Sequence, residues 1–148
     1  MKEVNGNIWS YWQDGYVVVI PTNLQVRRNG TAVMGAGLAL QAAENFPGLD
    51  FEYGIHLLSI DNNDNGSLYI SHAALFLLPT KNHWKDGSDI SLIENGLRVL
   101  VKWYNNQETK PSVALPRLGC GLGGLKWEEV KPLCAKWLTS DNFVVVSP

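Results

Sequence analysis

The chain has 148 residues, of which 45% are hydrophobic, and carries a formal net charge of −2. This length and composition predict one packed domain over residues 1–148 and argue against a disordered chain. The small negative charge argues against broad basic coverage of a nucleic-acid backbone. Met1–Val4 opens no apolar signal segment, and no apolar run approaches about 18 residues. We therefore expect a cytoplasmic, soluble protein without membrane contact.

Two segments in the first third of the chain have clear periodic patterns. Tyr16–Ile20 is an apolar run with β-branched residues that ends at Pro21. Such a run predicts a strand buried on both faces, as in a largely parallel sheet. Gly37–Phe46 has apolar residues at helical spacing, and Pro47-Gly48 follows it, so we predict a helix that ends there.

The middle of the chain predicts antiparallel pairing next to a further buried strand. Asn65-Gly66 lies between the apolar segments Ile55–Ile60 and Leu68–Ile70. An Asn-Gly pair between two such segments is typical of a β-hairpin. Ala74–Leu78 is a continuous apolar run closed by Pro79, which predicts a central strand.

The last third continues the alternation of helices and strands. Asp89–Tyr104 carries an apolar stripe at helical spacing, with Ser88 or Asp89 as the predicted N-cap and Gly96 as a weakening residue. Pro132 should kink the last predicted helix or mark its first turn. The remaining predicted elements are a strand over 112–115, a helix over 127–138 and a strand over 142–146.

This order of elements predicts a mixed, largely parallel sheet with helices on both faces, an α/β fold. In such sheets, ligands bind beyond the carboxyl ends of the strands. Three prolines each follow a predicted strand, so the residues after them should meet at one rim. Those residues are Thr22-Asn23, Thr80-Lys81 and Arg117–Gly124.

Two glycine-rich turns, Gly35–Gly37 and Gly119–Gly124, each precede a predicted helix. Backbone at a helix start presents unpaired N–H groups and the positive end of the helix dipole, which suits phosphate. One such turn is weak evidence, because glycine often only closes a turn. Two in one small chain indicate a ligand with more than one phosphate.

Two common phosphate motifs do not fit the second turn. Gly119, Gly121 and Gly124 match the G-x-G-x-x-G pattern, but with 24 residues after Gly124 and only Asp141 as a candidate ribose-binding acid we do not expect a dinucleotide-binding domain. A Walker loop is excluded because Lys126 follows Leu125 and no Ser or Thr comes next.

Other reactive residues give weaker signals. The three histidines lack metal-ligand spacing, so we expect no metal. Cys120 and Cys134 form no paired motif and indicate a reducing compartment. Cys120 is a candidate nucleophile, but the local sequence offers no histidine partner, which favours a small buried thiol. Trp84 is a candidate for stacking on a ligand ring, with a structural tryptophan as the alternative.

These residues resemble the macrodomains, a family that binds ADP-ribose, over nearly the whole chain. Gly6–Trp9 is similar to the segment whose acid receives the adenine amino group. Val33–Leu40 resembles the first phosphate loop of the family, and Leu115–Trp127 resembles the second. The resemblance implies a three-layer α/β/α fold and no cofactor. The ligand-binding residues that we predict are Asn7, Ile8, Thr22, Asn23, Met34, Gly35, Ala36, Gly37, Leu38, Arg117, Gly119, Cys120, Gly121, Leu122, Gly123 and Gly124.

Within the family, Leu78–Trp84 resembles the strand–lysine segment of a glycohydrolase branch. That branch includes terminal ADP-ribose protein glycohydrolases and DNA ADP-ribosyl glycohydrolase antitoxins, and its lysine is catalytic, which implies this role for Lys81. Asn7 departs from the pattern because it replaces the usual acid. Gly123 stands where the protein glycohydrolases carry a second acid, which favours the DNA-directed comparison. Leu24–Thr31 is longer than the corresponding antitoxin loop, and it would either reshape the distal-ribose pocket or form an exposed turn.

The expected function is to bind ADP-ribose and to hydrolyse ADP-ribosyl linkages on a macromolecule, either a DNA base or an acidic protein side chain. Lys81 would act at the distal ribose, which Asn23 would orient. The sequence leaves open whether the Lys81 amine attacks the sugar or stabilises charge. Its partner would be ADP-ribose or an ADP-ribosylated macromolecule, and we expect a monomer. The alternatives are a non-catalytic ADP-ribose reader, supported by Gly123, and an ADP-ribose 1″-phosphate phosphatase.

Overall fold

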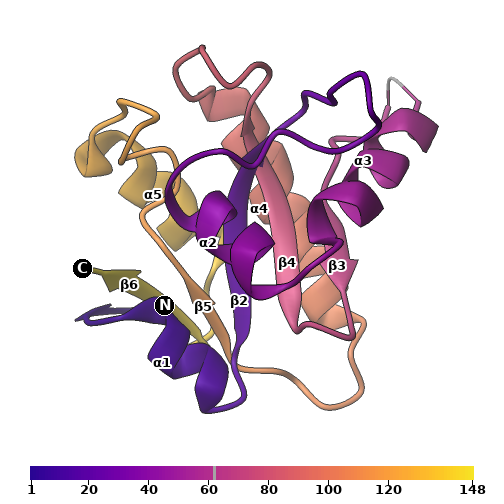
Figure 1. The fold of residues 1–148 in the computed structure, drawn as a ribbon. Coiled ribbons are helices and arrows are strands. Elements are labelled where there is room, and N and C mark those ends of the chain that lie inside the picture. The colour runs from indigo at the N-terminus through magenta and orange to yellow at the C-terminus, as the bar shows by residue number, and fades with distance from the viewer. Residues whose placement is uncertain (62) are drawn as a thin grey trace.

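The computed structural model describes residues 1–61 and 63–148, which form a six-stranded sheet with helices on both faces (Figure 1). The strands are β1 (Lys2–Asn5), β2 (Val17–Asn23), β3 (Leu68–Ile70), β4 (Leu75–Lys81), β5 (Val113–Leu115) and β6 (Phe143–Ser147). The helices are α1 (Ile8–Gln13), α2 (Gly37–Asn45), α3 (Leu49–Ser59), α4 (Ile90–Asn105) and α5 (Trp127–Trp137). No helix within these described ranges is long and apolar enough to span a membrane.

The sheet is mixed and mostly parallel, as predicted. Its strand order is β1-β6-β5-β2-β4-β3. The neighbours β1–β6, β6–β5, β5–β2 and β2–β4 pair in parallel, and β3 pairs antiparallel with β4 at one edge. Parallel strands direct their carboxyl ends to the same edge, so β2, β4 and β5 deliver the chain to one rim.

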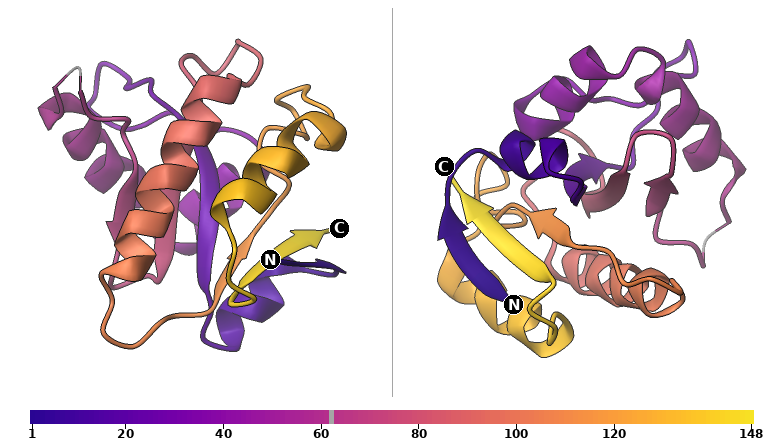
Figure 2. Two further views of the ribbon diagram at one scale, coloured as in Figure 1. Left: turned by 180° about the vertical axis from the view of Figure 1, so that it is seen from behind. Right: turned by 90° about the horizontal axis from the view of Figure 1, so that it is seen from below.

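Each face of the sheet carries its own hydrophobic core. On one face, Leu97 of α4 and Val130 of α5 are fully buried against strand residues such as Leu115. On the other face, Ala42 of α2 and Tyr53 of α3 are fully buried. Figure 2 shows α4 and α5 on the side of the sheet opposite α2 and α3. The three-layer α/β/α arrangement is therefore confirmed.

The prediction that Pro21 and Pro79 end their strands is wrong. Both residues lie inside β2 and β4, where Pro21 pairs with Leu78. The prolines are tolerated because each strand has lost one neighbour at that point: β5 accompanies β2 only to Val18, and β3 accompanies β4 only to Leu77. Proline is accepted at such a free edge, since no ladder N–H is lost.

The predicted hairpin is also wrong. Ile55–Ile60 does not pair with β3, because most of it belongs to α3. The antiparallel pairing instead joins β3 to β4 through the turn 71–74, in which Ala74 has a φ of 51°. Asn65-Gly66 lies in the connection before β3, where the Gly66 carbonyl accepts a hydrogen bond of 2.8 Å from the Tyr53 hydroxyl.

The later elements match their predictions closely, with two refinements. Asp89 caps α4, since its carboxylate accepts hydrogen bonds from the backbone of Ser91 and Leu92. Gly96 does more than weaken this helix: a Cβ there would lie 2.5 Å from the Leu78 side chain, so glycine permits close packing of α4 on β4. Pro132 lies inside α5 rather than in its first turn.

Candidate functional site

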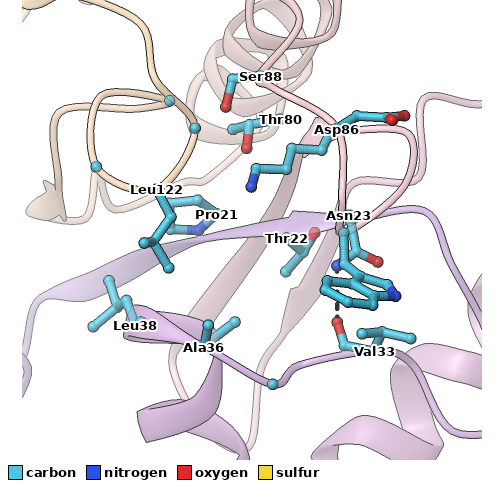
Figure 3. Close-up of a pocket in the computed structure, with 18 of the residues that line it drawn as sticks. Pro21, Thr22, Asn23, Val33, Ala36, Leu38, Thr80, Asp86, Ser88 and Leu122 are labelled. Carbon is cyan, nitrogen blue, oxygen red and sulfur yellow. Dashed lines mark hydrogen bonds between the residues drawn. The ribbon is translucent and has the colours of Figure 1, made fainter.

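A cavity of about 1020 Å³ lies at the carboxyl ends of β2, β4 and β5 (Figure 3). Small-molecule sites typically occupy about 300–1,000 Å³, so the cavity has room for a ligand of dinucleotide size. Its lining comes from the ends of the three strands and from the loops that follow them. The three predicted segments 22–23, 80–81 and 117–124 therefore do converge on one rim.

The first glycine turn forms one wall of the cavity. Gly35, Ala36 and Gly37 line it and lead directly into α2. Ala36 is the N-cap and supplies no side-chain hydrogen bond, unlike Asp89 at the start of α4. Among the described residues, no acceptor is seen for the N–H groups of Gly37, Leu38 and Ala39. These amides and the helix dipole offer an anion site at this wall.

The second glycine turn forms the facing wall. Gly119 has a φ of +76°, which glycine adopts without strain, and its carbonyl accepts the N–H of Leu125. Within the part of the chain that is described, the N–H groups of Gly121, Leu122 and Gly123 also lack a protein acceptor. Figure 3 shows the Leu122 side chain pointing toward the Leu38 loop from the opposite side of the pocket. The two turns thus offer two sets of free amides across one cavity.

The ends of β2 and β4 form the floor between these walls. The Asn23 side chain is fixed at both ends: its Nδ2 donates to the Val33 carbonyl at 3.0 Å, and its Oδ1 accepts the Gln25 N–H at 3.0 Å. Asn23 pairs with Lys81 in the strand register, after an irregularity at Thr22/Asn23. This bulge brings the predicted ribose-orienting side chain next to the predicted catalytic lysine.

Lys81 is half-buried and lines the cavity at the last position of β4. Over residues 1–61 and 63–148, its amine makes no ion pair with a carboxylate. The structure therefore presents a lysine that is held by the sheet and is free to meet a ligand. Whether it acts on one stays a prediction.

A buried tyrosine supports the floor from below. The Tyr53 hydroxyl lies 2.9 Å from the Thr22 hydroxyl and also donates to the Gly66 carbonyl. Burial raises the pKa of Tyr53 above its ordinary value, so this phenol stays protonated and keeps its role as a donor. Thr22 is thereby fixed at the end of β2, one residue before Asn23.

Gly123 is packed against the loop that joins β4 to α4. The Ser88 N–H donates to the Gly123 carbonyl at 2.9 Å. A Cβ at position 123 would overlap the Ser88 hydroxyl and would lie 2.5 Å from the Gly119 carbonyl oxygen. Figure 3 shows the Ser88 hydroxyl turned toward this second turn. The space that a side chain at position 123 would need is thus occupied by Ser88.

The Ser88 hydroxyl has no hydrogen-bond partner in the described part of the chain, although its oxygen is enclosed. Gln25 lines the same cavity, and its Oε1 is likewise enclosed and unpartnered among the residues described. Buried polar atoms are normally hydrogen-bonded. Two residues of the cavity lining thus each keep one enclosed polar atom without a hydrogen bond in the described structure.

The charged residues that line the cavity are mostly basic, although the net charge of the chain is negative. Arg27, Lys81, Lys85 and Arg117 line it, and Asp86 is the acidic residue of the lining. Figure 3 shows the Asp86 carboxylate turned away from the pocket. A chain with a net charge of −2 therefore concentrates positive charge around this one hollow, which suits an anionic ligand.

Most of the predicted site residues line this cavity, but five do not. Asn7 caps α1, where its side chain accepts the Trp9 N–H, and Ile8 starts the same helix. Met34 is buried in the core under α2 and α3. Cys120 and Gly124 belong to the second turn but lie outside the lining. Their predicted contacts with a ligand stay predictions.

The structure favours the structural role of Cys120. Burial raises the pKa of this thiol above its ordinary value, so the reactive thiolate is disfavoured. Its Sγ lies 3.4 Å from the Leu118 carbonyl as a weak donor. No group of three or more His, Cys, Asp or Glu side chains able to hold a metal is found among the described residues.

Several lining residues are not among the predicted ligand-binding residues, and two of them lie in the long loop after β2. Gln25 and Arg27 face the cavity, and the Arg27 guanidinium donates to the Ala32 carbonyl at 3.0 Å. The isolated bridge between Val26 and Ala32 folds this loop back on itself. The sequence showed the Arg27-Arg28 pair, but no local pattern told which arginine turns inward.

A comparison with protein families identifies the family of this chain. The family model for the Macro domain matches residues 62–134. Three layers, a parallel-rich sheet and two glycine turns facing each other beyond the strand ends are the features that the sequence resemblance implied. The chain belongs to the macrodomain family.

Relatives with assigned names are more specific. The chain is 40% identical over 137 residues to a DNA ADP-ribosyl transferase-DNA ADP-ribosyl glycohydrolase fusion protein from Thermosipho africanus, which covers 78% of this chain and 35% of the relative. It is 34% identical over 110 residues to a DNA ADP-ribosyl glycohydrolase from Thermus aquaticus, which covers 70% of this chain and 30% of the relative. The chain thus spans about a third of the length of these curated relatives.

Solved structures with a similar fold include proteins from the same two organisms. The Thermosipho africanus DarTG structure in complex with ADP-ribose superposes with a TM-score of 0.80 at 27% identity, over 100% of this chain and 42% of that chain. The macrodomain of Thermus aquaticus DarG gives a TM-score of 0.76 at 27% identity, over 99% of this chain and 97% of that one.

Proposed function

We propose that this macrodomain binds ADP-ribose and releases it from ADP-ribosylated DNA by hydrolysis. The observation that carries the proposal is the arrangement of two sets of free amides on facing walls, with Lys81 on the floor between them. The names of the relatives and the ADP-ribose complex of the Thermosipho protein support the same ligand and reaction.

The walls fit a diphosphate. Three unpartnered N–H groups at the start of α2 and three in the second turn can donate to phosphate oxygens without displacing any protein bond among the described residues. Hydrogen bonds to a charged group contribute about 1.5–3 kcal/mol each. Arg27 and Arg117 add positive charge at the same walls.

The floor fits the reaction. With the diphosphate between the turns, the distal ribose would lie over the ends of β2 and β4, next to Asn23 and Lys81. Two routes are then open to the lysine. The neutral amine can form a bond to the anomeric carbon while the glycosidic bond breaks; the electron pair of that bond leaves with the base, which takes up the proton that the amine gives up. The resulting glycosylamine opens to an imine, which water hydrolyses to free ADP-ribose and the lysine amine. Alternatively, its ammonium can stabilise the charge that develops on the leaving base.

Gly123 separates this site from a lysine–acid mechanism. A carboxylate at this position would overlap the Ser88 hydroxyl, so the second acid of the protein glycohydrolases has no place here. This observation supports DNA rather than an acidic protein side chain as the carrier of the ADP-ribose. It equally favours a second candidate, a reader that binds ADP-ribose without turnover.

Two substrates decide between these functions. The protein is incubated with ADP-ribosylated single-stranded DNA and, separately, with a protein modified on acidic side chains, and released ADP-ribose is measured. We expect release from DNA alone. Release from the modified protein alone would contradict the DNA assignment, and tight ADP-ribose binding without any release would establish the reader. Trapping of a Lys81–sugar adduct with borohydride would separate the two lysine routes.

A further inference from the structure

Trp84 is a large aromatic side chain placed at the open rim of the cavity. Its exposed fraction is 50%, yet it belongs to the cavity lining. Tryptophan usually buries most of its surface, because its large apolar rings gain free energy when removed from water. A half-exposed tryptophan at the mouth of a ligand cavity therefore offers a flat apolar face to whatever occupies that mouth.

The ring is held in place by its neighbours in the chain. The His83 ring stacks on it with a centroid distance of 5.8 Å and an interplanar angle of 26°. The Lys85 ammonium lies 5.2 Å from its centroid. A second aromatic ring and a cation therefore both pack on the indole, and aromatic rings and cations are the groups that stack on nucleobases and contact the adjoining phosphates.

The loop that carries this group, residues 82–88, is fastened at several points. The Asp86 N–H donates to the His83 carbonyl, and the Lys85 N–H donates to His83 Nδ1. At the far end, the Ser88 N–H donates to the Gly123 carbonyl. The backbone of the loop that carries the indole is therefore held before a ligand arrives, which lowers the entropy that binding must overcome.

Trp84 also lies close in sequence to the proposed reaction centre. It is three residues after Lys81, and both side chains line the same cavity. A group attached to the distal ribose at Lys81 would therefore share this cavity with the Trp84 side chain.

We propose that Trp84 stacks on the nucleobase to which the ADP-ribose is linked, with Lys85 contacting the phosphate backbone of that strand. This proposal rests on the proposed function and names the part of the substrate that the 82–88 loop recognises. The occupant is single-stranded nucleic acid, since a base inside a duplex cannot reach a pocket without leaving the stack. An acidic protein side chain offers no ring for the indole.

The test compares Trp84→Ala, Trp84→Phe and the wild type on an ADP-ribosylated single-stranded oligonucleotide. Phe51→Ala is the matched control, because Phe51 is 51% exposed but lies on α3 outside the cavity lining. We expect Trp84→Ala to lower kcat/KM about 10-fold or more, the range of one lost base–aromatic stack, and Trp84→Phe to recover most of the loss. The Kd for free ADP-ribose should change by less than about twofold, since the stack adds nothing to the diphosphate walls.

Lys85→Ala gives a second readout. Loss of one phosphate contact should reduce the slope of log affinity for the oligonucleotide against log salt by about 1. An unchanged slope would overturn the role of Lys85.

The outcomes distinguish the stacking role of Trp84 from the proposed release of ADP-ribose. If the wild type releases ADP-ribose from DNA and Trp84→Ala behaves like Phe51→Ala, the stacking proposal is overturned while the proposed function stands. An equal loss on a modified protein substrate would also overturn it, because the indole would then act without a base. If the wild type neither binds ADP-ribose nor releases it, the proposed function itself fails.

Discussion

The two ends of the cavity are built from different parts of the chain. The end between the glycine turns offers backbone N–H groups from α2 and from Gly121–Gly123. The other end, from Lys81 to Ser88, offers side chains on one strand end and one loop. A ligand must approach backbone N–H donors closely, so a larger side chain beside them blocks binding. Side-chain groups, in contrast, can be replaced by substitution without a change in the backbone.

This difference predicts which end of the cavity determines the affinity for ADP-ribose and which end determines turnover. Substitutions at the backbone end should change ADP-ribose binding, because any Cβ that points into the cavity keeps phosphate away from the amides. Substitutions at the side-chain end should change turnover and the choice of substrate, with binding of free ADP-ribose preserved. The predictions that follow test this division.

The largest effect is expected from Lys81→Ala. This change removes the amine from the floor and leaves both walls intact, so turnover should fall at least about 100-fold, the usual contribution of a positioned catalytic group. The Kd for ADP-ribose, measured by calorimetry, should stay within a few-fold of the wild type. Lys102→Ala on α4 is the control, and Lys81→Arg tests whether charge alone suffices. Full activity in Lys81→Ala would remove the lysine mechanism.

A clear effect on binding is expected from Gly121→Val. A Cβ at position 121 meets no atom within 4 Å and Gly121 has no positive φ, so the fold should tolerate the side chain. The added bulk would block phosphate from the neighbouring amides and weaken ADP-ribose binding about 10-fold to 100-fold, as expected for one lost charged hydrogen bond. Calorimetry and the unfolding temperature measure both properties. Unchanged affinity with an intact fold would show that this turn does not hold the phosphate.

Gly123→Ala tests the close contact between the second glycine turn and Ser88 of the 82–88 loop. Its Cβ would overlap the Ser88 hydroxyl and approach the Gly119 carbonyl, so the free energy of unfolding should fall by about 1–3 kcal/mol. Gly121→Ala, whose Cβ meets nothing within 4 Å, is the control. Adding Ser88→Gly should recover part of the loss, because one of the two overlaps is removed. Strictly additive effects in this double-mutant cycle would contradict the contact.

The smallest effect is expected from Asn7→Asp. Asn and Asp are comparable N-caps, so α1 and the stability of the fold should not change measurably. If the adenine amino group meets this position as the resemblance implies, a charged acceptor should strengthen ADP-ribose binding by about 1 kcal/mol, or roughly fivefold. No gain in affinity would place the adenine elsewhere.

Much of the fold could be predicted because local patterns and packing agree. Ala74–Leu78 and the stripe from Ile90 to Tyr104 are continuous enough to define β4 and α4. α3 was missed because Phe51, Ile55 and Leu58 remain exposed and blur its apolar periodicity. Its Gly54 looks like a helix breaker, but a Cβ there would overlap the Gly30 carbonyl, a contact far away in sequence.

The site could be predicted where it consists of backbone and strand ends, and less well where it depends on loop conformation. The glycine turns and Lys81 follow from sequence position, since parallel strands deliver their ends to one rim. The inward turn of Arg27 depends on its hydrogen bond to Ala32, and the closure of Ser88 over Gly123 depends on a bond between two loops. No local pattern encodes either contact.

The most direct test is a crystal structure of the protein with ADP-ribose bound. We predict that the diphosphate oxygens accept hydrogen bonds from the amides of 37–39 and 121–123, with the distal ribose beside the Lys81 amine. A nucleotide bound outside this cavity, or a Lys81 side chain directed into solvent while the ligand is in place, would contradict the account.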